Sequence, residues 1–402
     1  MQECAVLGGN WNRSRCPIGI DLGTHSVKLL QLSRGPSALG SYTAIAAASR
    51  TLPTDSPPDG AERCGLLTEL IRDMLTSQPF VGCKVVSCLP VTAIQYKNLR
   101  LPKMPADDLH AAVEWEATDR LNLPSDEVYL QYFNAGEVRQ GEELRQEIIV
   151  MAAHRAAVQE HLAMLTGCDL QPVAIDVVPG ALARCLGRFD PADLQAPARV
   201  VLDMGFSSSK VVIVRNGRVV FFKLIDIGGR KLDETVARHL NLSVAEAAEL
   251  RRRLRDDEPE GEGDSVPFGS TGRENVKRAV FEAMRSVVQD LSKELQLCLR
   301  YYSVTFRGRR PEQVTLVGGE SRDPSVVEVL ADGTRVAIEP AQSLNHVDLS
   351  PLKPSPDGGE ASAGDAEPPS RSTANDDPRL WAVAAGLSMR PDARALRKRG
   401  AA

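Results

Sequence analysis

One short pattern occurs twice in this chain of 402 residues, and it constrains the fold more than any other feature. The first copy spans residues 18–32 and the second spans residues 200–214. Each copy reads as an apolar strand, an Asp-x-Gly turn, small or hydroxyl residues, and then a lysine within a second apolar strand. The duplication predicts two related halves, each of which contains a strand–turn–strand hairpin.

A hairpin of this kind directs backbone N–H groups and hydroxyls toward one spot, where they can hold phosphate without a Gly-rich loop that opens a helix. The aspartate that ends each first strand, Asp21 or Asp203, can meet a phosphate-bound Mg²⁺ through water. One copy alone would be ordinary turn chemistry. The recurrence, with Lys28 and Lys210 each seven residues after the aspartate, indicates a nucleotide clamped between the halves.

The candidate ligands of this nucleotide are the turn residues themselves. Turns favour glycine and serine even without a ligand, so each hydroxyl could be either a turn former or a phosphate donor. No acidic or amide residue can be assigned to position an attacking water, so the catalytic residues stay unassigned and slow or no hydrolysis is expected. The candidates in the two turns are Gly23, Thr24, His25, Ser26 and Lys28, and Gly205, Phe206, Ser207, Ser208 and Ser209.

Composition narrows the functional classes. The hydrophobic fraction of 43% is typical of a globular protein, and the net charge of −5 without a basic stripe argues against a nucleic-acid partner. The eight cysteines are scattered without metal-ligand spacing, as expected in a reducing compartment. No signal peptide and no membrane span is predicted. The basic tail, residues 391–402, lacks the bulky apolar residues of a membrane anchor.

The pattern of strands and helices predicts an α/β protein with an insertion. Residues 17–90 and 171–199 form the first subdomain, and residues 200–390 form the second domain. Between them, residues 91–170 read as strand, helix, strand, strand and helix, which is a small α+β module.

Two segments of the second domain have the composition of mobile chain. Residues 256–272 are acidic and Gly-rich, and residues 340–378 are rich in Pro, Ser, Gly and acidic residues. An apolar helix at 380–389 follows the second segment, so that segment is predicted to be a disordered insertion within the second domain.

The paired hairpins, together with a strand that ends at Gly318 and Gly319, resemble the actin-like ATPase superfamily, in which such a Gly-Gly turn lies against adenosine. The inserted module narrows the resemblance to the type IV pilus assembly protein PilM family. The run that carries it is Leu-Pro-Lys-Met-Pro-Ala-Asp-Asp-Leu at 101–109, which continues through Glu-Trp-Glu-Ala to Glu-Val-Tyr at 127–129. Further similar runs lie at 150–155, 226–242 and 381–390.

The resemblance implies a duplicated ribonuclease-H-like, actin-like fold with an inserted subdomain of the FtsA type. It also implies ATP and Mg²⁺ as cofactors, with Asp21 and Asp203 on the metal side. The sequence departs from the family at His25, where Ser or Ala is usual. Beyond the two hairpins, the resemblance adds Gly228, Gly229, Glu249, Gly318 and Gly319 to the cofactor site.

The same resemblance implies a cytoplasmic scaffold that is recruited to the inner membrane. Its partner would be the N-terminal cytoplasmic tail of a PilN-like membrane protein, held in a groove beside the inserted subdomain, near strands 91–101 and 128–135. Other pilus or type II secretion components and a homodimer are further expected partners. An FtsA-like division protein and a small-molecule phosphotransferase of the same superfamily remain as alternative functions.

Overall fold

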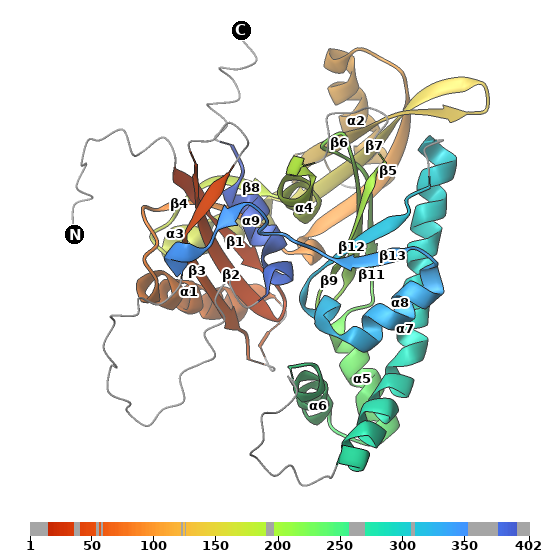
Figure 1. Ribbon diagram of the computed structural model, residues 1–402. Coiled ribbons are helices and arrows are strands. Elements are labelled where there is room, and N and C mark those ends of the chain that lie inside the picture. The colour runs from red at the N-terminus through yellow and green to blue at the C-terminus, as the bar shows by residue number, and fades with distance from the viewer. Residues whose placement is uncertain are drawn as a thin grey trace.

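The computed structural model describes residues 15–35, 41–53, 56–57, 59–121, 124, 126–189, 197–256, 270–306, 310–352 and 377–391. Within these ranges the chain forms three sheets: one in each half and one in the inserted module (Figure 1). The predicted α/β class is therefore confirmed. No helix in these ranges combines the length and the apolar character that crossing a bilayer would require.

The first sheet has the order β14-β3-β2-β1-β4-β8. Its apolar side chains alternate between two faces, and each face is covered by helices. One face packs on α1 (Gly60–Ser77) and α3 (Arg155–Gly167), and the other packs on α9 (Ala382–Ser388), which in turn packs on α4 (Val178–Leu186). The strands are β1 (Arg15–Leu22), β2 (Ser26–Arg34), β3 (Tyr42–Thr51), β4 (Lys84–Cys88), β8 (Gln171–Asp176) and β14 (Val347–Asp348).

The second sheet, of order β11-β10-β9-β12-β13, repeats the plan of the first. In each half three successive strands are antiparallel, and a later strand runs parallel to the first of them. This shared plan confirms that the halves are related. The strands are β9 (Arg199–Met204), β10 (Ser209–Arg215), β11 (Arg218–Ile225), β12 (Gln313–Val317) and β13 (Ala337–Pro340), with helices α5 (Gly229–Leu240), α6 (Val244–Asp256), α7 (Ser270–Phe306) and α8 (Pro324–Thr334).

The inserted module is an antiparallel sheet, β5-β7-β6, backed by one helix. Its strands are β5 (Ile94–Pro102), β6 (Val128–Gln140) and β7 (Glu143–His154), and its helix is α2 (Ala106–Leu121). Leu99, Val113 and Ile148 form its small core. Figure 1 shows the module beside the end of α7, and β6 packs on both α7 and β11.

The module is smaller than the predicted range 91–170, because its last predicted helix belongs elsewhere. Met164 and Leu165 of α3 are buried with Leu67 and Ile71 of α1. The helix therefore covers the first sheet, and the module ends at His154. Helical spacing reveals an apolar face but does not identify the sheet that the face will cover.

The predicted second domain, 200–390, is also wrong at its end, because the chain returns to the first sheet after β13. Strand β14 pairs with β3, and α9 packs on β1, β2 and α4. Two glycines permit this approach: a Cβ at Gly19 would overlap the Ala384 carbonyl, and a Cβ at Gly386 would overlap the Ala181 carbonyl.

The predicted disordered insertion, 340–378, begins too early. Residues 340–352 are part of the fold, and Ala341 and Leu344 are buried in the core. These scattered apolar residues supply enough buried surface to offset the cost of ordering the segment. The remainder, 353–376, lies outside the described residues, as do most of the predicted mobile loop (257–269) and the basic tail from residue 392 onward.

Candidate nucleotide-binding site

The two predicted turns have the same backbone geometry. In the first, the Gly23 N–H donates to the Ser26 carbonyl at 3.0 Å, and in the second the Gly205 N–H donates to the Ser208 carbonyl at 3.1 Å. In the ladders behind them, Asp21 lies opposite Lys28, and Asp203 lies opposite Lys210. The sequence repeat is therefore a structural repeat, with an aspartate–lysine pair behind each turn.

The carboxylates of the two halves converge. Burial raises the pKa of Asp21, and the negative charge of Asp203 raises it further, against the lowering effect of Lys28 and Lys210. Lys210 Nζ lies 3.0 Å from Asp203 Oδ2, and Lys28 Nζ donates to Ser26 Oγ at 2.7 Å. Two cationic and two anionic groups thus lie close together at the junction between the halves, and this composition suits a phosphate chain and its metal ion.

Two rings lie between the turns. His25 of the first turn and Phe206 of the second have ring centroids 4.8 Å apart. The Arg230 guanidinium carbon also lies 5.5 Å from the centre of the Phe206 ring. Burial lowers the pKa of His25, and the nearby Lys28 charge lowers it further, so the imidazole is neutral at pH 7. A neutral imidazole keeps one N–H donor.

Glycines allow the second turn to approach its neighbours. The Gly229 N–H donates to the Gly205 carbonyl at 3.1 Å, and a Cβ at Gly228 would overlap backbone atoms of Gly205 and Phe206. Gly318 has φ +91°, and a Cβ there would overlap the Met204 carbonyl. A Cβ at Gly319 would meet open space.

The predicted hydroxyls differ in what they contact. Ser209 Oγ donates to the Ile227 carbonyl at 2.6 Å, so it holds the turn in place. Ser208 Oγ is buried and has no hydrogen-bond partner in the described part of the chain. A buried hydroxyl without a hydrogen-bond partner is rare in a folded protein, and this one is available to a bound ligand. Thr24 and Ser207 lie at the bends of the two turns.

A buried charge cluster that the sequence did not predict lies beside the second turn, where a Cβ at Gly229 would overlap the Glu320 carboxylate. Arg251 of α6 lies 2.5 Å from Asp233 of α5 and 2.5 Å from Glu320. Glu320 belongs to the short helix η4 (Gly319–Arg322), directly after the Gly-Gly turn. The Arg251 side chain is 4% exposed, so the cluster bridges α6 to the Gly-Gly turn away from solvent.

Glu249 of α6, which the family resemblance places in the cofactor site, does not join this cluster. Its carboxylate accepts from Arg252 and Arg253 at 2.8 and 2.7 Å, and those bonds lower its pKa to about 2. Arg251, two positions further along, is the residue that points inward, because a helix turns about 200° over two residues. The run of three arginines at positions 251–253 was the sequence feature that could have indicated an inward-facing cation on this helix.

These residues fit phosphate groups at the junction between the halves. Lys28, Lys210 and the unpaired Ser208 hydroxyl supply donors, whereas the Arg251–Glu320 bridge lies where the Gly-Gly turn would meet adenosine. In the described ranges no three His, Cys, Asp or Glu side chains are grouped closely enough to hold a metal ion. A Mg²⁺ ion facing Asp21 and Asp203 would therefore depend on phosphate oxygens and water for its other ligands.

Comparison with known proteins agrees with this geometry. A model of the family described as type IV pilus assembly protein PilM matches residues 19–354. A solved PilM-PilN type IV pilus biogenesis complex contains a chain that is 25% identical, with a TM-score of 0.70 over 93% of this chain and 98% of that one. The ethanolamine utilization protein EutJ from Carboxydothermus hydrogenoformans is 11% identical, with a TM-score of 0.50 over 93% and 89%.

The duplicated sheets and the facing turns define a protein of the actin-like class. The chain belongs to the family of the type IV pilus assembly protein PilM. This membership favours the pilus scaffold among the three functions that the sequence left open.

Proposed function

We propose that this chain is an ATP-binding scaffold of a type IV pilus or related type II secretion machine. It works at the cytoplasmic face of the inner membrane and binds the N-terminal tail of a PilN-like membrane protein. The observation that carries the nucleotide part is the structural repeat of the two turns, which bring Asp21 and Asp203 close to each other at the junction of the halves. Family membership and the similarity to the PilM-PilN complex support the partner.

In the nucleotide site, Lys28, Lys210 and Ser208 would hold the phosphates, and Asp21 and Asp203 would face Mg²⁺ through water. Bound ATP–Mg²⁺ would supply binding energy that holds the two halves together. No side chain is assigned to activate water, so occupancy rather than turnover is the proposed role.

For the peptide, the junction between the module and the first sheet offers an apolar surface. Ile175 of β8 packs on Ile94 and Met151 of the module. Val173, two residues earlier on β8, is 44% exposed. Strand β8 is also the last strand of its sheet, so its outer edge can accept an added strand.

The module contributes an aromatic residue to the same junction. Tyr129 of β6 is 47% exposed and pairs in register with Ala153, which is buried at the junction. The Arg155 guanidinium carbon lies 4.3 Å from the Tyr129 ring centre, and Arg155 Nε is buried without an acceptor among the described residues. An exposed tyrosine beside an unsatisfied donor suits a peptide that brings both apolar side chains and backbone carbonyls.

The test of this proposal is titration of the full chain with the N-terminal tail peptide of the PilN-like protein encoded in the same organism. We expect saturable binding that Tyr129→Ala weakens at least ten-fold. Trp115→Ala is the matched control, because Trp115 is an aromatic residue of the same module that is 73% exposed on α2. Equal binding of a scrambled peptide, or equal losses in both variants, would contradict the proposed groove.

A further inference from the structure

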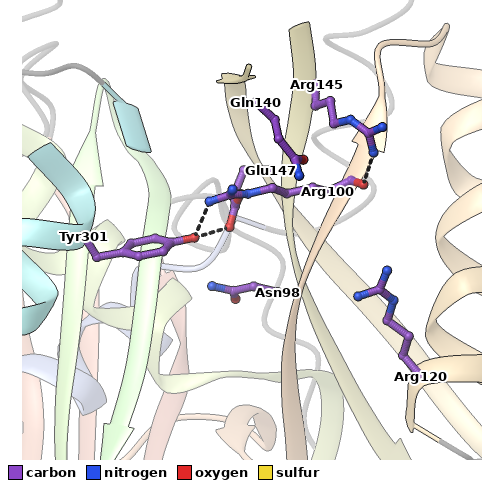
Figure 2. A pocket seen from close by; sticks show the side chains of 7 residues that line it. All are labelled: Asn98, Arg100, Arg120, Gln140, Arg145, Glu147 and Tyr301. Carbon is purple, nitrogen blue, oxygen red and sulfur yellow. Dashed lines mark hydrogen bonds and ion pairs between the residues drawn. The ribbon is translucent and has the colours of Figure 1, made fainter. Parts of the chain in front are cut away.

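A polar pocket lies where the inserted module meets the second half, and none of its lining residues belongs to the proposed nucleotide site or peptide groove. It has a volume of about 290 Å³ and is lined by polar or charged side chains. Figure 2 shows the Arg100 guanidinium beside Tyr301 and Glu147, with Arg120 and Arg145 further to the right in the view. The lining residues are Asn98, Arg100, Arg120, Gln140, Arg145, Glu147 and Tyr301.

A buried hydrogen-bonded triad forms the base of this pocket and joins the two parts. Glu147 of β7 is 1% exposed. One of its oxygens accepts from Tyr301 of α7 at 2.7 Å, and the other accepts from Arg100 Nε at 2.7 Å. Arg100 Nη2 also donates to the Tyr301 hydroxyl at 3.1 Å. The Glu147 charge is thus neutralised within the triad, and Arg100 is held in a fixed position.

The arginines that face the pocket keep free donor capacity. Arg100 Nη1 has no acceptor among the described residues, and neither have Nη1 and Nη2 of Arg120. Arg120 Nε pairs with Glu116, and Arg145 pairs with Glu143, whose side chain is 70% exposed. An ion pair as exposed as the Arg145–Glu143 pair contributes little, so a better placed anion can replace it.

We propose that this pocket binds a small molecule with two oxyanion groups, one on Arg100 and the other on Arg120. Guanidinium groups recognise carboxylate and phosphate through paired N–H donors. The volume equals that of about ten water molecules, which exceeds a single phosphate and matches a pyrophosphate or a small di- or tricarboxylate. The amides of Asn98 and Gln140 can bond the remaining oxygens.

Such a ligand would join β5 to α2 within the module, because Arg100 and Arg120 both belong to it, and it would reach α7 through the hydrogen bond between Arg100 and Tyr301. Arg100 is joined to Tyr301 of the second half, and Arg120 lies in the last turn of α2 in the module. Occupancy would therefore fix the module, which carries one side of the proposed peptide groove, against the half that carries the second phosphate turn.

The experiment is calorimetric titration of the full chain with pyrophosphate, citrate and acetate at physiological ionic strength. We expect saturable binding of pyrophosphate or citrate, but not of acetate. If pyrophosphate binds more tightly, the natural ligand carries phosphoryl groups, and if citrate binds more tightly, it carries carboxylates. Arg120→Gln should weaken binding at least ten-fold. Arg139→Gln is the matched control, because Arg139 is an exposed arginine next to Gln140 on the opposite face of β6. No saturable heat, or binding that survives Arg120→Gln, would overturn the site.

The effect of the ligand on the contact between the module and α7 is measured separately, by hydrogen exchange. Saturation with the tighter anion should slow hydrogen exchange in β5 and in the last turns of α7. Tyr301→Phe, which removes only the hydroxyl that joins Arg100 and Glu147 to α7, should abolish the slowing in α7. Equal slowing in the wild-type protein and in Tyr301→Phe would show that the anion does not act through this link.

Discussion

His25 and Phe206 bring the two duplicated turns into direct contact, with their ring centroids 4.8 Å apart. Phe206 directly follows Gly205 and His25 lies two residues after Gly23, so each ring belongs to its own phosphate-turn candidate. The halves are therefore in aromatic contact at the two turns, and we expect a bound phosphate chain to separate these rings.

Removing either ring should make this junction easier to open. An aromatic contact of this kind is worth about 0.5–1.5 kcal/mol, so Phe206→Ala should tighten ATP–Mg²⁺ binding up to about ten-fold. His25→Ala should have the same effect, and the double variant should gain no more than either single one, since both remove one contact. Titration calorimetry measures this, and weaker binding in both single variants would show instead that the rings hold the nucleotide.

Asp21→Asn should stabilise the nucleotide-free protein at pH 7. Burial raises the pKa of Asp21, so the folded protein keeps this proton to a higher pH than the unfolded chain. The resulting stability is present below the unfolded pKa and is lost as pH rises through the folded one. Melting temperatures between pH 4 and pH 7 should therefore fall less in the variant.

The same variant should lose the rise in melting temperature that ATP–Mg²⁺ causes. Asp73→Asn, at a carboxylate with a 64% exposed side chain, is the control and should change neither property. A variant that is less stable at pH 7 yet still responds to ATP–Mg²⁺ would contradict the assignment of Asp21.

Arg251→Met should be strongly destabilising, because it leaves the buried carboxylates of Asp233 and Glu320 without their cation. Removing one partner of a buried ion pair costs about 3–5 kcal/mol. Urea unfolding measures the loss, and adding Glu320→Gln should restore part of it. Arg252→Met, on the exposed side of the same helix, should change stability by less than about 0.5 kcal/mol.

His161 should make the first half sensitive to acid. Burial lowers its pKa to about 4, and Ser87 Oγ lies 2.7 Å from its Nε2. Between pH 6.5 and pH 4 the unfolded chain binds a proton at His161 that the folded protein does not bind. The free energy of unfolding therefore falls as pH falls, by about 3 kcal/mol over this range. His161→Gln should flatten this part of the pH profile of unfolding, whereas His110→Gln, at an exposed site on α2, should not.

Gly386→Ala tests the close approach of α9 to α4, because the added methyl would overlap the Ala181 carbonyl. We expect a loss of roughly 3 kcal/mol or more, since backbone atoms cannot move aside as a flexible side chain can. Gly65→Ala in α1 is a matched control, because a Cβ there meets nothing within 4 Å. It should stabilise the helix by about 1 kcal/mol. Similar melting temperatures for the two variants would exclude a tight α4–α9 contact.

Local patterns predicted most elements of this fold because they depend on neighbouring residues. The Asn216–Gly217 pair shows this: Asn-Gly is a strong signal for a tight hairpin turn, and both residues have the positive φ that such a turn requires. The repeat of Asp21 and Asp203 likewise predicted two facing hairpins, since identical turns on related sheets meet across the interface.

Long-range relationships were not predictable in the same way. Nothing in the sequence near α3 or α9 says which sheet each helix will cover, so both were assigned to the wrong unit. The Arg251–Glu320 bridge joins residues 69 positions apart, and the triad of Arg100, Glu147 and Tyr301 spans 201 positions. Pairings of this kind depend on the packed arrangement of elements, which a single sequence does not encode in any short pattern.

The place of α9 also governs how the protein can fold as it is synthesised. Ser388 receives a hydrogen bond from the backbone of Leu32, 356 residues earlier, so the first sheet gains its second cover only after those intervening residues have been translated. At 5–20 residues per second this delay is roughly 20–70 s. During that time one apolar face of the nascent sheet is incomplete. The emerging chain is therefore a substrate for chaperones, and truncation before α9 would leave a sheet prone to aggregation.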